Sequence, residues 1–382
     1  MIVVSLIFFT YVITIGVFAF GYDKIKDFTP KELDIKTRFT VVIPFRNEAK
    51  NLPKLAASIL RLNYPAAQVE FIFIDDDSTD DSVEVLKQYF EYNKEVTDLN
   101  YTQPDISIIK NERNSNSPKK DAITTALKVS TKEWIITTDA DCILPENWLK
   151  TIDNFIQQND CNLVVAPVTY ITNKSFLHQF QLLDFLSLQA STVSGFGLGK
   201  PFLCNGANLA YKKEIFENVN GFENNNSIAS GDDIFLLEKF LKFDNSKVAY
   251  LKSDEAIVKT FPVDTFGQLI HQRVRWASKT ASYNLVFGKL IGVLILLGNG
   301  IIALSPLLVF YEIISTTTAL SYFLIKLFFD YVLLEKISAF YKQKLPFSIY
   351  LSSSILYPYF TLFVVFKSLF SNYQWKGRTF KK

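Results

Sequence analysis

Four long stretches without charge, or nearly so, constrain this chain of 382 residues more than any other feature. Residues 2–20, 290–311 and 345–366 contain no charged side chain, and residues 315–334 contain only Lys326 and Asp330. A helix needs about 20 such residues to cross the apolar core of a bilayer. The hydrophobic content of 49% is also high for a soluble protein. We therefore expect four membrane segments.

The first segment sets the expected orientation. Residues 2–20 lack the basic start and small-residue cleavage site of a signal peptide, so we interpret them as an uncleaved membrane span. Lysines and arginines follow it closely: Lys24, Lys26, Lys31, Lys36 and Arg38. Basic flanks stay on the cytoplasmic side. The polar middle of the chain is therefore predicted to be cytosolic, with the N-terminus outside.

The last segment conflicts with this orientation. Four full spans would place the basic residues 375–382 outside, against the preference of basic residues for the cytoplasmic side. The loop at 342–344, before this last segment, is equally basic. Residues 345–366 contain Pro346 and Pro358, so we favour a re-entrant or interfacial segment over a full span that breaks the charge rule. Lys326 and Asp330 are four residues apart on one helix face and are interpreted as a structural pair.

The polar middle alternates between predicted strands and helices. Apolar runs at 39–44, 69–74 and 106–109, and one starting at Trp134, indicate buried strands, while helical spacing is found at 52–62, 82–89 and 120–129. This alternation predicts a parallel, doubly wound sheet whose ligands lie outside the carboxyl ends of its strands. Residues 177–188 have the spacing of a packing helix, in which His178 and Asp184 receive no role, and residues 195–199 predict a flexible loop.

The run from Trp134 ends in two carboxylates, Asp139 and Asp141. Residues two apart on a strand point the same way, so the two acids would face one site. Two neighbouring carboxylates repel each other unless a cation or proton intervenes, and oxygen ligands suit Mg²⁺ or Mn²⁺. We interpret the pair as a metal site for a diphosphate. The alternative is a solvated turn after a strand.

Two further strands are followed by polar clusters. Asn47 and Glu48 follow the first strand, and acids at 75–77, 80 and 81 follow the second. Helix capping by Ser78 or Asp80 accounts for one or two of these residues. The surplus favours recognition of a nucleobase N–H by Asp76, with Asp75 as the second choice.

Lys119 and Lys120 precede the next predicted helix, where a cation could meet a phosphate or sugar. A solvated surface pair is the alternative. Asp232 and Asp233 precede a further predicted helix. If they have no functional role, they cap this helix, with Asp232 as the cap.

Several functional classes are not indicated. There is no Gly-x-Gly-x-x-Gly motif after the first strand and no P-loop sequence. The net charge of +2 comes without a basic stripe, so no nucleic-acid partner is expected. The three cysteines are far apart and the two histidines are scattered, which does not indicate a Cys or His metal site.

Taken in order, seven motifs resemble those of the inverting family 2 glycosyltransferases. They lie at residues 40–48, 74–80, 119–122, 138–141, 205–208, 231–233 and 272–276. The resemblance implies an α/β fold, with a Rossmann-like, mostly parallel GT-A catalytic domain in the cytosol and α-helical transmembrane segments. Two positions depart from the family: Asp77 stands where Gly or a small residue is usual, and Asp232 replaces a Glu.

The resemblance also implies roles for individual residues. Asp233 would be the catalytic base, and Asp139 and Asp141 would hold a divalent cation, Mg²⁺ or Mn²⁺. The nucleotide-sugar ligands would be Pro44, Asn47, Glu48, Asp75, Asp76, Lys119, Asp139, Ala140, Gln272, Arg275 and Trp276. The acceptor side would comprise Asn205, Gly206, Asp232 and Trp276. The bland alternative for residues 272–276 is an amphipathic helix at the membrane surface.

These features predict a membrane-bound inverting glycosyltransferase that moves a sugar from a nucleotide-diphosphate sugar to a lipid or lipid-linked hydroxyl. A uridine donor is the commoner case in that family. Alternatives are a processive polysaccharide synthase and, outside the enzymes, a nucleotide-binding membrane scaffold or transport component. The expected domains are a transmembrane helix at 1–22, a cytosolic catalytic domain with an interfacial helix at 23–283, three membrane segments at 284–371 and a basic tail at 372–382. A bacterial-type inner or cell membrane is the expected location.

Overall fold

The computed structural model describes residues 1–96, 103–226, 228–370, 373–375 and 378–380. The chain forms two compact units. The helical unit comprises Met1–Ile25, Thr172–Leu203 and Pro262–Lys382, and the sheet unit comprises Lys26–Ile171 and Cys204–Phe261. Each unit is described by itself below.

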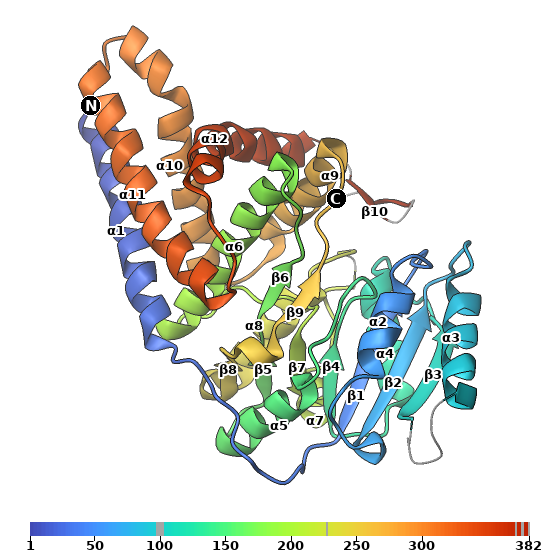
Figure 1. Ribbon diagram of the computed structural model, residues 1–382. Coiled ribbons are helices and arrows are strands. Elements are labelled where there is room, and N and C mark those ends of the chain that lie inside the picture. The colour runs from blue at the N-terminus through green and yellow to red at the C-terminus, as the bar shows by residue number, and fades with distance from the viewer. Residues whose placement is uncertain (97–102, 227, 371–372, 376–377, 381–382) are drawn as a thin grey trace. The chain divides into compact units, whose positions relative to one another are not determined.

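The sheet unit is built on a mostly parallel sheet, as the sequence predicts (Figure 1). Within the described residues it has seven strands in the order β3-β2-β1-β4-β7-β5-β8. Their bounds are β1 Phe39–Phe45, β2 Val69–Asp75, β3 Asp105–Lys110, β4 Trp134–Thr137, β5 Leu163–Val165, β7 Leu209–Lys212 and β8 Val248–Tyr250. Strand β7 runs antiparallel to both β4 and β5, which the sequence analysis does not anticipate. A second, two-stranded sheet pairs β6 (Val168–Tyr170) with β9 (Val258–Thr260).

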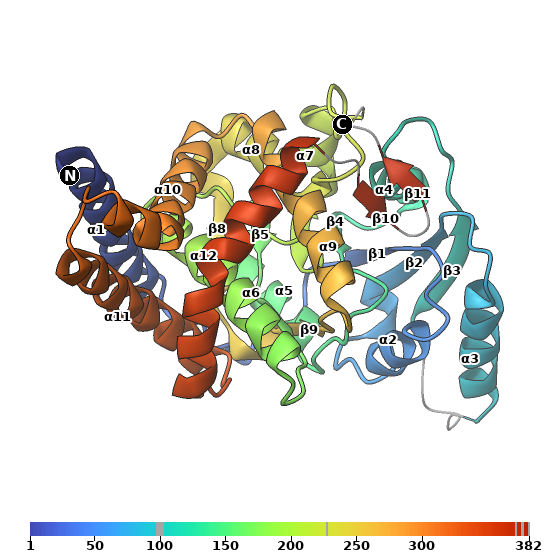
Figure 2. The same ribbon diagram turned by 90° about the horizontal axis from the view of Figure 1, so that it is seen from above.

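Helices cover both faces of the sheet. In Figure 2, α4 lies on one face of β1 and β2, and α2 and α3 lie on the other. The helices of this unit are α2 Leu52–Ile59, α3 Ser82–Val96, α4 Pro118–Val129, α5 Trp148–Gln158, α7 Lys213–Asn218 and α8 Asp232–Asp244. Strands covered on both faces need apolar residues throughout. Accordingly, every residue of β2 and β4 is buried.

Three predicted helix boundaries differ from the structure. Helix α2 ends at Ile59 rather than residue 62, because residues 60 and 61 form a turn ahead of Pro65. Helix α3 continues beyond residue 89 to Val96. Helix α4 begins at Pro118, whose fixed φ suits a first helical position, so Lys119 lies within the first turn rather than before it.

The helical unit contains four helices that are long and apolar enough to cross a membrane, within the described residues. They are α1 Ile2–Lys24, α10 Val286–Phe310, α11 Thr316–Phe340 and α12 Phe347–Phe370. Its other elements are α6 Phe176–Gly197, α9 Phe266–Ser278 and the strands β10 Tyr373–Trp375 and β11 Arg378–Phe380. The basic tail at 372–382 lies partly outside the described residues.

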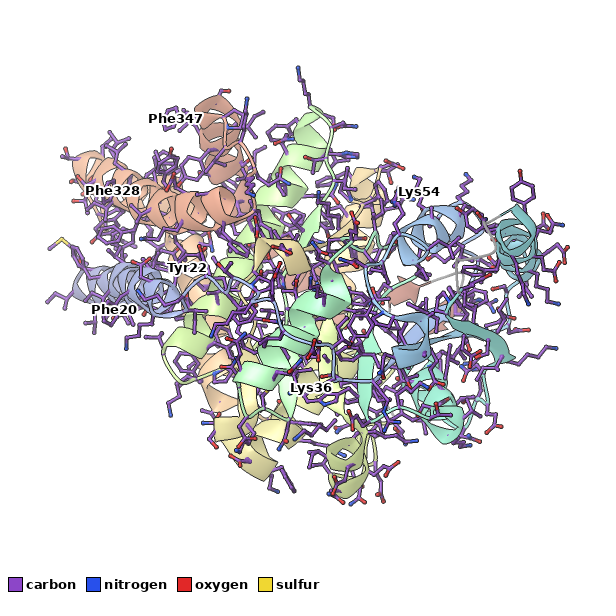
Figure 3. The ribbon with its side chains drawn as sticks, turned by 60° about the horizontal axis from the view of Figure 1, so that its bottom comes forward. Phe20, Tyr22, Lys36, Lys54, Phe328 and Phe347 are labelled. Atoms are coloured by element: carbon purple, nitrogen blue, oxygen red, sulfur yellow. The ribbon has the colours of Figure 1, made fainter. Side chains whose placement is uncertain are left out.

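Helices α1, α10 and α11 contact one another, and α12 runs at a steep angle to them and packs against α10, α9 and α6 (Figures 1 and 2). Their apolar side chains face outward: Phe20, Phe328 and Phe347 are each about 60% exposed (Figure 3). Lys326 and Asp330 form the expected pair at 2.5 Å, and the Tyr11 hydroxyl donates to the same carboxylate.

The flexible loop expected at residues 195–199 is wrong. Helix α6 continues to Gly197, and only Gly199 has a positive φ, of 66°. The reason for glycine at 197 is close approach, because an added Cβ would lie 1.8 Å from the carbonyl oxygen of Gly21 on α1. Gly197 therefore serves helix packing, whereas Gly199 serves the turn that follows the helix.

Candidate functional site

Lys119 lies at the centre of a cluster of acids in the sheet unit. Its Nζ is 2.7 Å from Oδ1 of Asp139 and 3.4 Å from Oδ2 of Asp232. Asp139 follows β4, and Asp232 is the first residue of α8. The fold therefore brings together three predicted site residues from separate stretches of sequence.

Gly206 packs against the same cluster. A Cβ at this position would lie 3.1 Å from Oδ2 of Asp232, 3.4 Å from Nζ of Lys119 and 3.5 Å from Cβ of Asp233. Thr137, the last residue of β4, donates its hydroxyl to the Gly206 carbonyl over 2.7 Å. The loop before β7 is thus tied to the end of β4, and any side chain at 206 would crowd the acids.

The two acids of α8 have different surroundings. Gly231 is the N-cap residue, with φ of 83°, so the prediction that Asp232 caps this helix is wrong. Asp232 is 8% exposed and pairs with Lys119. The Asp233 carboxylate accepts hydrogen bonds from the backbone N–H groups of Gly206 at 3.3 Å and Ile234 at 2.8 Å.

The ammonium group of Lys119 is held in its charged form. Burial lowers the pKa of Lys119, but the carboxylates of Asp139, Asp232 and Asp233 outweigh this effect and raise it well above its ordinary value. A charged Lys119 reduces the repulsion among the three acids.

Asp139 and Asp141 lie outside strand β4, so the prediction that strand alternation turns them to one face is wrong. Strand β4 ends at Thr137, and the two acids lie in a following turn in which the N–H of Cys142 donates to the Asp139 carbonyl. Strand alternation therefore does not set their directions. The Asp139 side chain is 40% exposed, and the Asp141 carboxylate lies beside the Sγ of Cys142. Ala140 between them is buried.

Oxygen ligands of this kind fit a hard divalent ion. Mg²⁺ is commonly held by one or two carboxylates together with substrate phosphates. No group of three or more His, Cys, Asp or Glu residues that could hold a metal occurs among the described residues. A cation at Asp139 and Asp141 would therefore need further oxygen ligands, which a diphosphate can supply.

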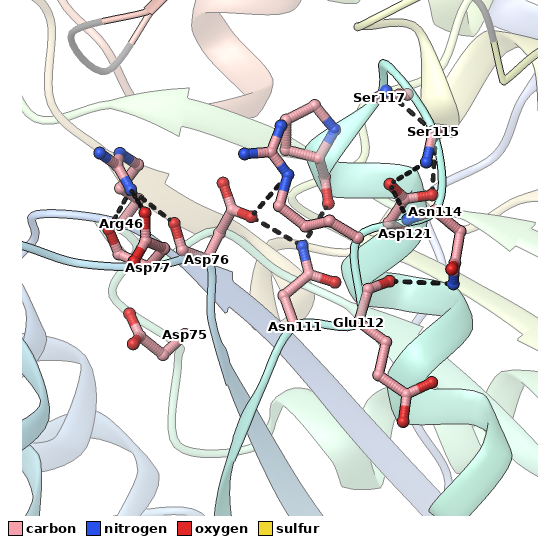
Figure 4. Close-up of polar contacts among 12 residues, drawn as sticks. Arg46, Asp75, Asp76, Asp77, Asn111, Glu112, Asn114, Ser115, Ser117 and Asp121 are labelled. Atoms are coloured by element: carbon pink, nitrogen blue, oxygen red, sulfur yellow. Dashed lines mark hydrogen bonds and ion pairs between the residues drawn. The ribbon is translucent and has the colours of Figure 1, made fainter.

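The acids after β2 divide into separate roles (Figure 4). The Asp75 side chain points away from Asn111. It accepts a hydrogen bond from the N–H of Ser78 at 2.9 Å, which stabilises the turn after β2. Asp76 faces Asn111 and Arg113. Asp77 has φ of 64°, the left-handed conformation that favours Gly, and Arg46 donates to its carbonyl oxygen. The aspartate thus adopts the backbone shape that a glycine would adopt more easily.

Asn111 and Arg113 are site residues that the sequence analysis missed. The Asn111 amide donates to Asp76 at 2.7 Å and to the Pro118 carbonyl at 3.0 Å, and Nε of Arg113 lies 3.7 Å from Asp76. Both follow β3 at the edge where the other strand ends lie. A polar cluster after a predicted strand was the available signal.

The residues predicted after β1 line the same edge. Asn47 has φ of 53°, and its side-chain oxygen accepts from the N–H of Thr79 at 2.8 Å. Glu48 is buried and accepts from the Asn51 amide, and Pro44 lies in β1 itself. Asn205, before β7, accepts from the N–H of Ala207 at 2.9 Å. Both loops are fixed by internal hydrogen bonds.

The remaining predicted residues, Gln272, Arg275 and Trp276, lie on α9 of the helical unit. A capping box formed by Thr265 and Gln268 begins this helix. Arg273, between the predicted residues, donates to the Gln272 side chain, and its guanidinium carbon lies 4.1 Å from the centre of the Trp276 ring.

Comparison with known proteins identifies similar chains. Glycosyltransferase AglE of Haloferax volcanii is 21% identical over 238 residues, which is 62% of this chain and 70% of that protein. Beta-monoglucosyldiacylglycerol synthase of Nostoc is 24% identical over 62% of this chain, and the match spans 48% of that longer protein.

A solved structure resembles the whole chain. Mannosyltransferase PcManGT from Pyrobaculum calidifontis, determined with GDP-Man and Mn²⁺, aligns with a TM-score of 0.59 and 17% identity over 97% of both chains. This likeness confirms the GT-A fold expected from the sequence.

Two family models match the sequence. Glycosyl transferase family 2 matches residues 40–219, and Glycosyl transferase family group 2 matches residues 134–366. The first covers the strand ends that carry the acids, and the second extends from β4 into α12. Since the second match includes more than half of the chain, this protein belongs to glycosyl transferase family group 2.

Proposed function

We propose that this enzyme is a membrane-bound, inverting hexosyltransferase that passes a sugar from a nucleotide-diphosphate sugar to a hydroxyl of a lipid or lipid-linked acceptor. The observation that carries the proposal is the cluster of Lys119, Asp139, Asp232 and Gly206, with Asp233 beside it. Such a cluster offers a cation for phosphate and a carboxylate for a proton within one site.

The chemistry follows from these groups. In an inverting transfer, the acceptor oxygen attacks the anomeric carbon opposite the departing diphosphate, and the acceptor proton goes to a base. We assign this base to Asp233, whose carboxylate is oriented by the N–H groups of Gly206 and Ile234. Lys119 would stabilise negative charge on the leaving diphosphate. Asp76, held by Asn111, would accept from the nucleobase.

The other roles predicted from the sequence are part of the proposal. Asp139 and Asp141 would hold Mg²⁺ or Mn²⁺, which would neutralise charge on the diphosphate when bound. On the helical unit, Gln272 and Arg275 would contact the donor, and Trp276 would contact the acceptor sugar. PcManGT was solved with GDP-Man and Mn²⁺, which supports a nucleotide donor and a divalent ion here.

A lipid acceptor fits the chain's apolar helices, because a soluble acceptor would not require a membrane-bound enzyme. The name of the similar Nostoc protein, a monoglucosyldiacylglycerol synthase, supports the same class of acceptor. We propose that the enzyme lies in a bacterial-type cell membrane. The sheet unit would be on the cytosolic side, because basic residues follow α1.

The arrangement of α12 supports a specific topology. With α1, α10 and α11 as spans and α12 at a steep angle to them, at the membrane surface, the loop at 342–344 and the basic tail would share the cytosolic side. The charge conflict in the sequence then disappears. We therefore propose three spans and one interfacial helix.

The test is to incubate membranes containing the enzyme with radiolabelled UDP- and GDP-sugars. The proposal predicts label in organic-extractable lipid, dependent on added Mg²⁺ or Mn²⁺. Label in insoluble polymer would instead indicate a processive synthase, and binding of nucleotide without transfer would indicate a scaffold. Proton NMR of the product should give the anomeric configuration opposite to that of the donor.

A further inference from the structure

A buried ion pair in the helical unit joins three helices. Oδ2 of Asp184 on α6 lies 2.5 Å from Nε of Arg273 on α9, and the hydroxyl of Tyr357 on α12 donates to Oδ1 of the same carboxylate over 2.9 Å. Asp184 and Arg273 are 7% and 5% exposed. Both oxygens of one carboxylate are thus used to connect α9 and α12 to α6.

The arginine of this pair contacts two residues of the proposed site. It donates a hydrogen bond to the Gln272 side chain and lies over the ring of Trp276. Stacking between a guanidinium and an indole is favourable and restricts the ring's orientation. Arg273 is held by Asp184 on one side and contacts Gln272 and Trp276 on the other.

Stability alone does not account for such a pair. Removing two charges from water costs several kcal/mol per ion, and apolar residues of similar volume often stabilise a protein equally well. A carboxylate that accepts from both Arg273 and Tyr357 does fix the direction of the guanidinium. The geometry therefore suits orientation of a neighbouring side chain.

A second contact from α6 holds the segment just before α9. The buried Gln181, three residues before Asp184, exchanges two hydrogen bonds with the backbone of Val263, at 2.9 and 3.0 Å. Helix α6 thus fixes α9 both ahead of its first turn and at Arg273. Two contacts from α6 thus restrain the helix that carries Trp276.

We infer that Asp184 is a positioning residue for acceptor binding: through Arg273 it orients Trp276, and through Tyr357 it couples this orientation to α12. The inference rests on the proposed function, in which Trp276 contacts the acceptor sugar. It adds to that function a link between the acceptor side and the helix proposed to lie at the membrane surface.

A matched control exists in the same unit. Asp330 on α11 also pairs with a cation, Lys326, and accepts from a tyrosine hydroxyl, that of Tyr11. These partners lie on α1 and α11. Asp330→Asn should therefore cause a comparable structural loss without changing the orientation of Trp276. Tyr350→Phe, which removes another α12 hydroxyl bonded to Leu327, is the control for Tyr357→Phe.

The experiment measures the KM for the lipid acceptor and kcat in the full-length enzyme. Asp184→Asn should raise the acceptor KM roughly tenfold, the equivalent of one hydrogen bond to a charged group. Tyr357→Phe should raise it less, and Asp184→Glu should recover part of the loss. Asp330→Asn and Tyr350→Phe should leave the acceptor KM unchanged, whatever their effect on Tm.

An Asp184→Asn enzyme with the wild-type acceptor KM would overturn the inference, as would an equal rise in KM for Asp330→Asn. If Asp184→Asn does not fold, Tyr357→Phe decides by the same comparison with Tyr350→Phe. A wild-type enzyme that transfers no sugar would overturn the proposed function together with the inference. An active wild type with unchanged variants would overturn the inference alone.

Discussion

The ammonium nitrogen of Lys119 lies 2.7 Å from Oδ1 of Asp139, although twenty positions separate the two residues in the sequence. Asp232, on α8, completes the group at 3.4 Å from the same nitrogen. This relationship links the first turn of α4, the turn after β4 and the start of α8 in one electrostatic unit.

Removing this cation should destabilise the enzyme. Lys119→Met removes the cation that pairs with the largely buried Asp232 and with Asp139, which should cost about 3 kcal/mol. Thermal unfolding in detergent measures the loss. Lys128→Met is the control, because its pair with Glu112 is more than half exposed and should contribute less than about 1 kcal/mol. Adding Asp232→Asn to Lys119→Met should restore part of the stability; a strictly additive double variant would argue against the unit.

Substitutions of Asp75 and Asp76, two of the acids after β2, should have different effects. Asp76→Asn should weaken nucleotide binding by about 10- to 100-fold, because a charged acceptor for the base is lost. Asp75→Asn should mainly lower Tm, since Asp75 bonds the turn at Ser78. Equilibrium binding of UDP and GDP, compared with unfolding curves, distinguishes the two. Reversed effects would transfer the proposed base contact to Asp75.

The effect of a divalent ion on donor binding should depend on Asp139 and Asp141, the acids after β4. The double substitution of Asp139→Asn and Asp141→Asn should abolish the Mn²⁺-dependent part of donor binding, because the proposed ligands lose their charge. Donor affinity is measured with Mn²⁺ and with a chelator. Asp160→Asn, an exposed acid paired with Lys247, serves as the control. If chelation leaves the wild-type affinity for the donor unchanged, the proposed metal role fails.

The proposed membrane topology can be tested by labelling a cysteine at the C-terminus. A cysteine added after Lys382 should react with a membrane-impermeant maleimide only from the cytosolic side, because α12 is proposed to lie at the surface. Glu312→Cys, between α10 and α11, should react only from the outside. Labelling of the C-terminal cysteine from outside would indicate that α12 crosses the membrane.

Long, regular features were predictable from the sequence. The strands β1 to β4 and the four long apolar helices follow from continuous apolar runs and their polar ends. The strands β5 to β9, of three or four residues each, were not predicted. The antiparallel direction of β7 depends on long-range pairing, which local sequence does not encode.

The site was predictable in its acids and less so in their contacts. Polar residues at strand ends indicate which side chains share an edge, and Asn111 and Arg113 could have been found by that rule. The pairing of Lys119 with Asp232 and of Asp184 with Arg273 depends on tertiary packing. A single aspartate on an apolar helix carries no signal of its partner.

Asp233 is proposed to take the acceptor proton within this cluster. The most direct test compares Asp233→Asn with wild type in one preparation, by donor affinity and by transfer rate, with Asp254→Asn as an exposed control. We expect near-normal donor affinity and a transfer rate lower by a factor on the order of 10³, within the range expected for loss of a general base. An Asp233→Asn enzyme that keeps most of its turnover would contradict this role.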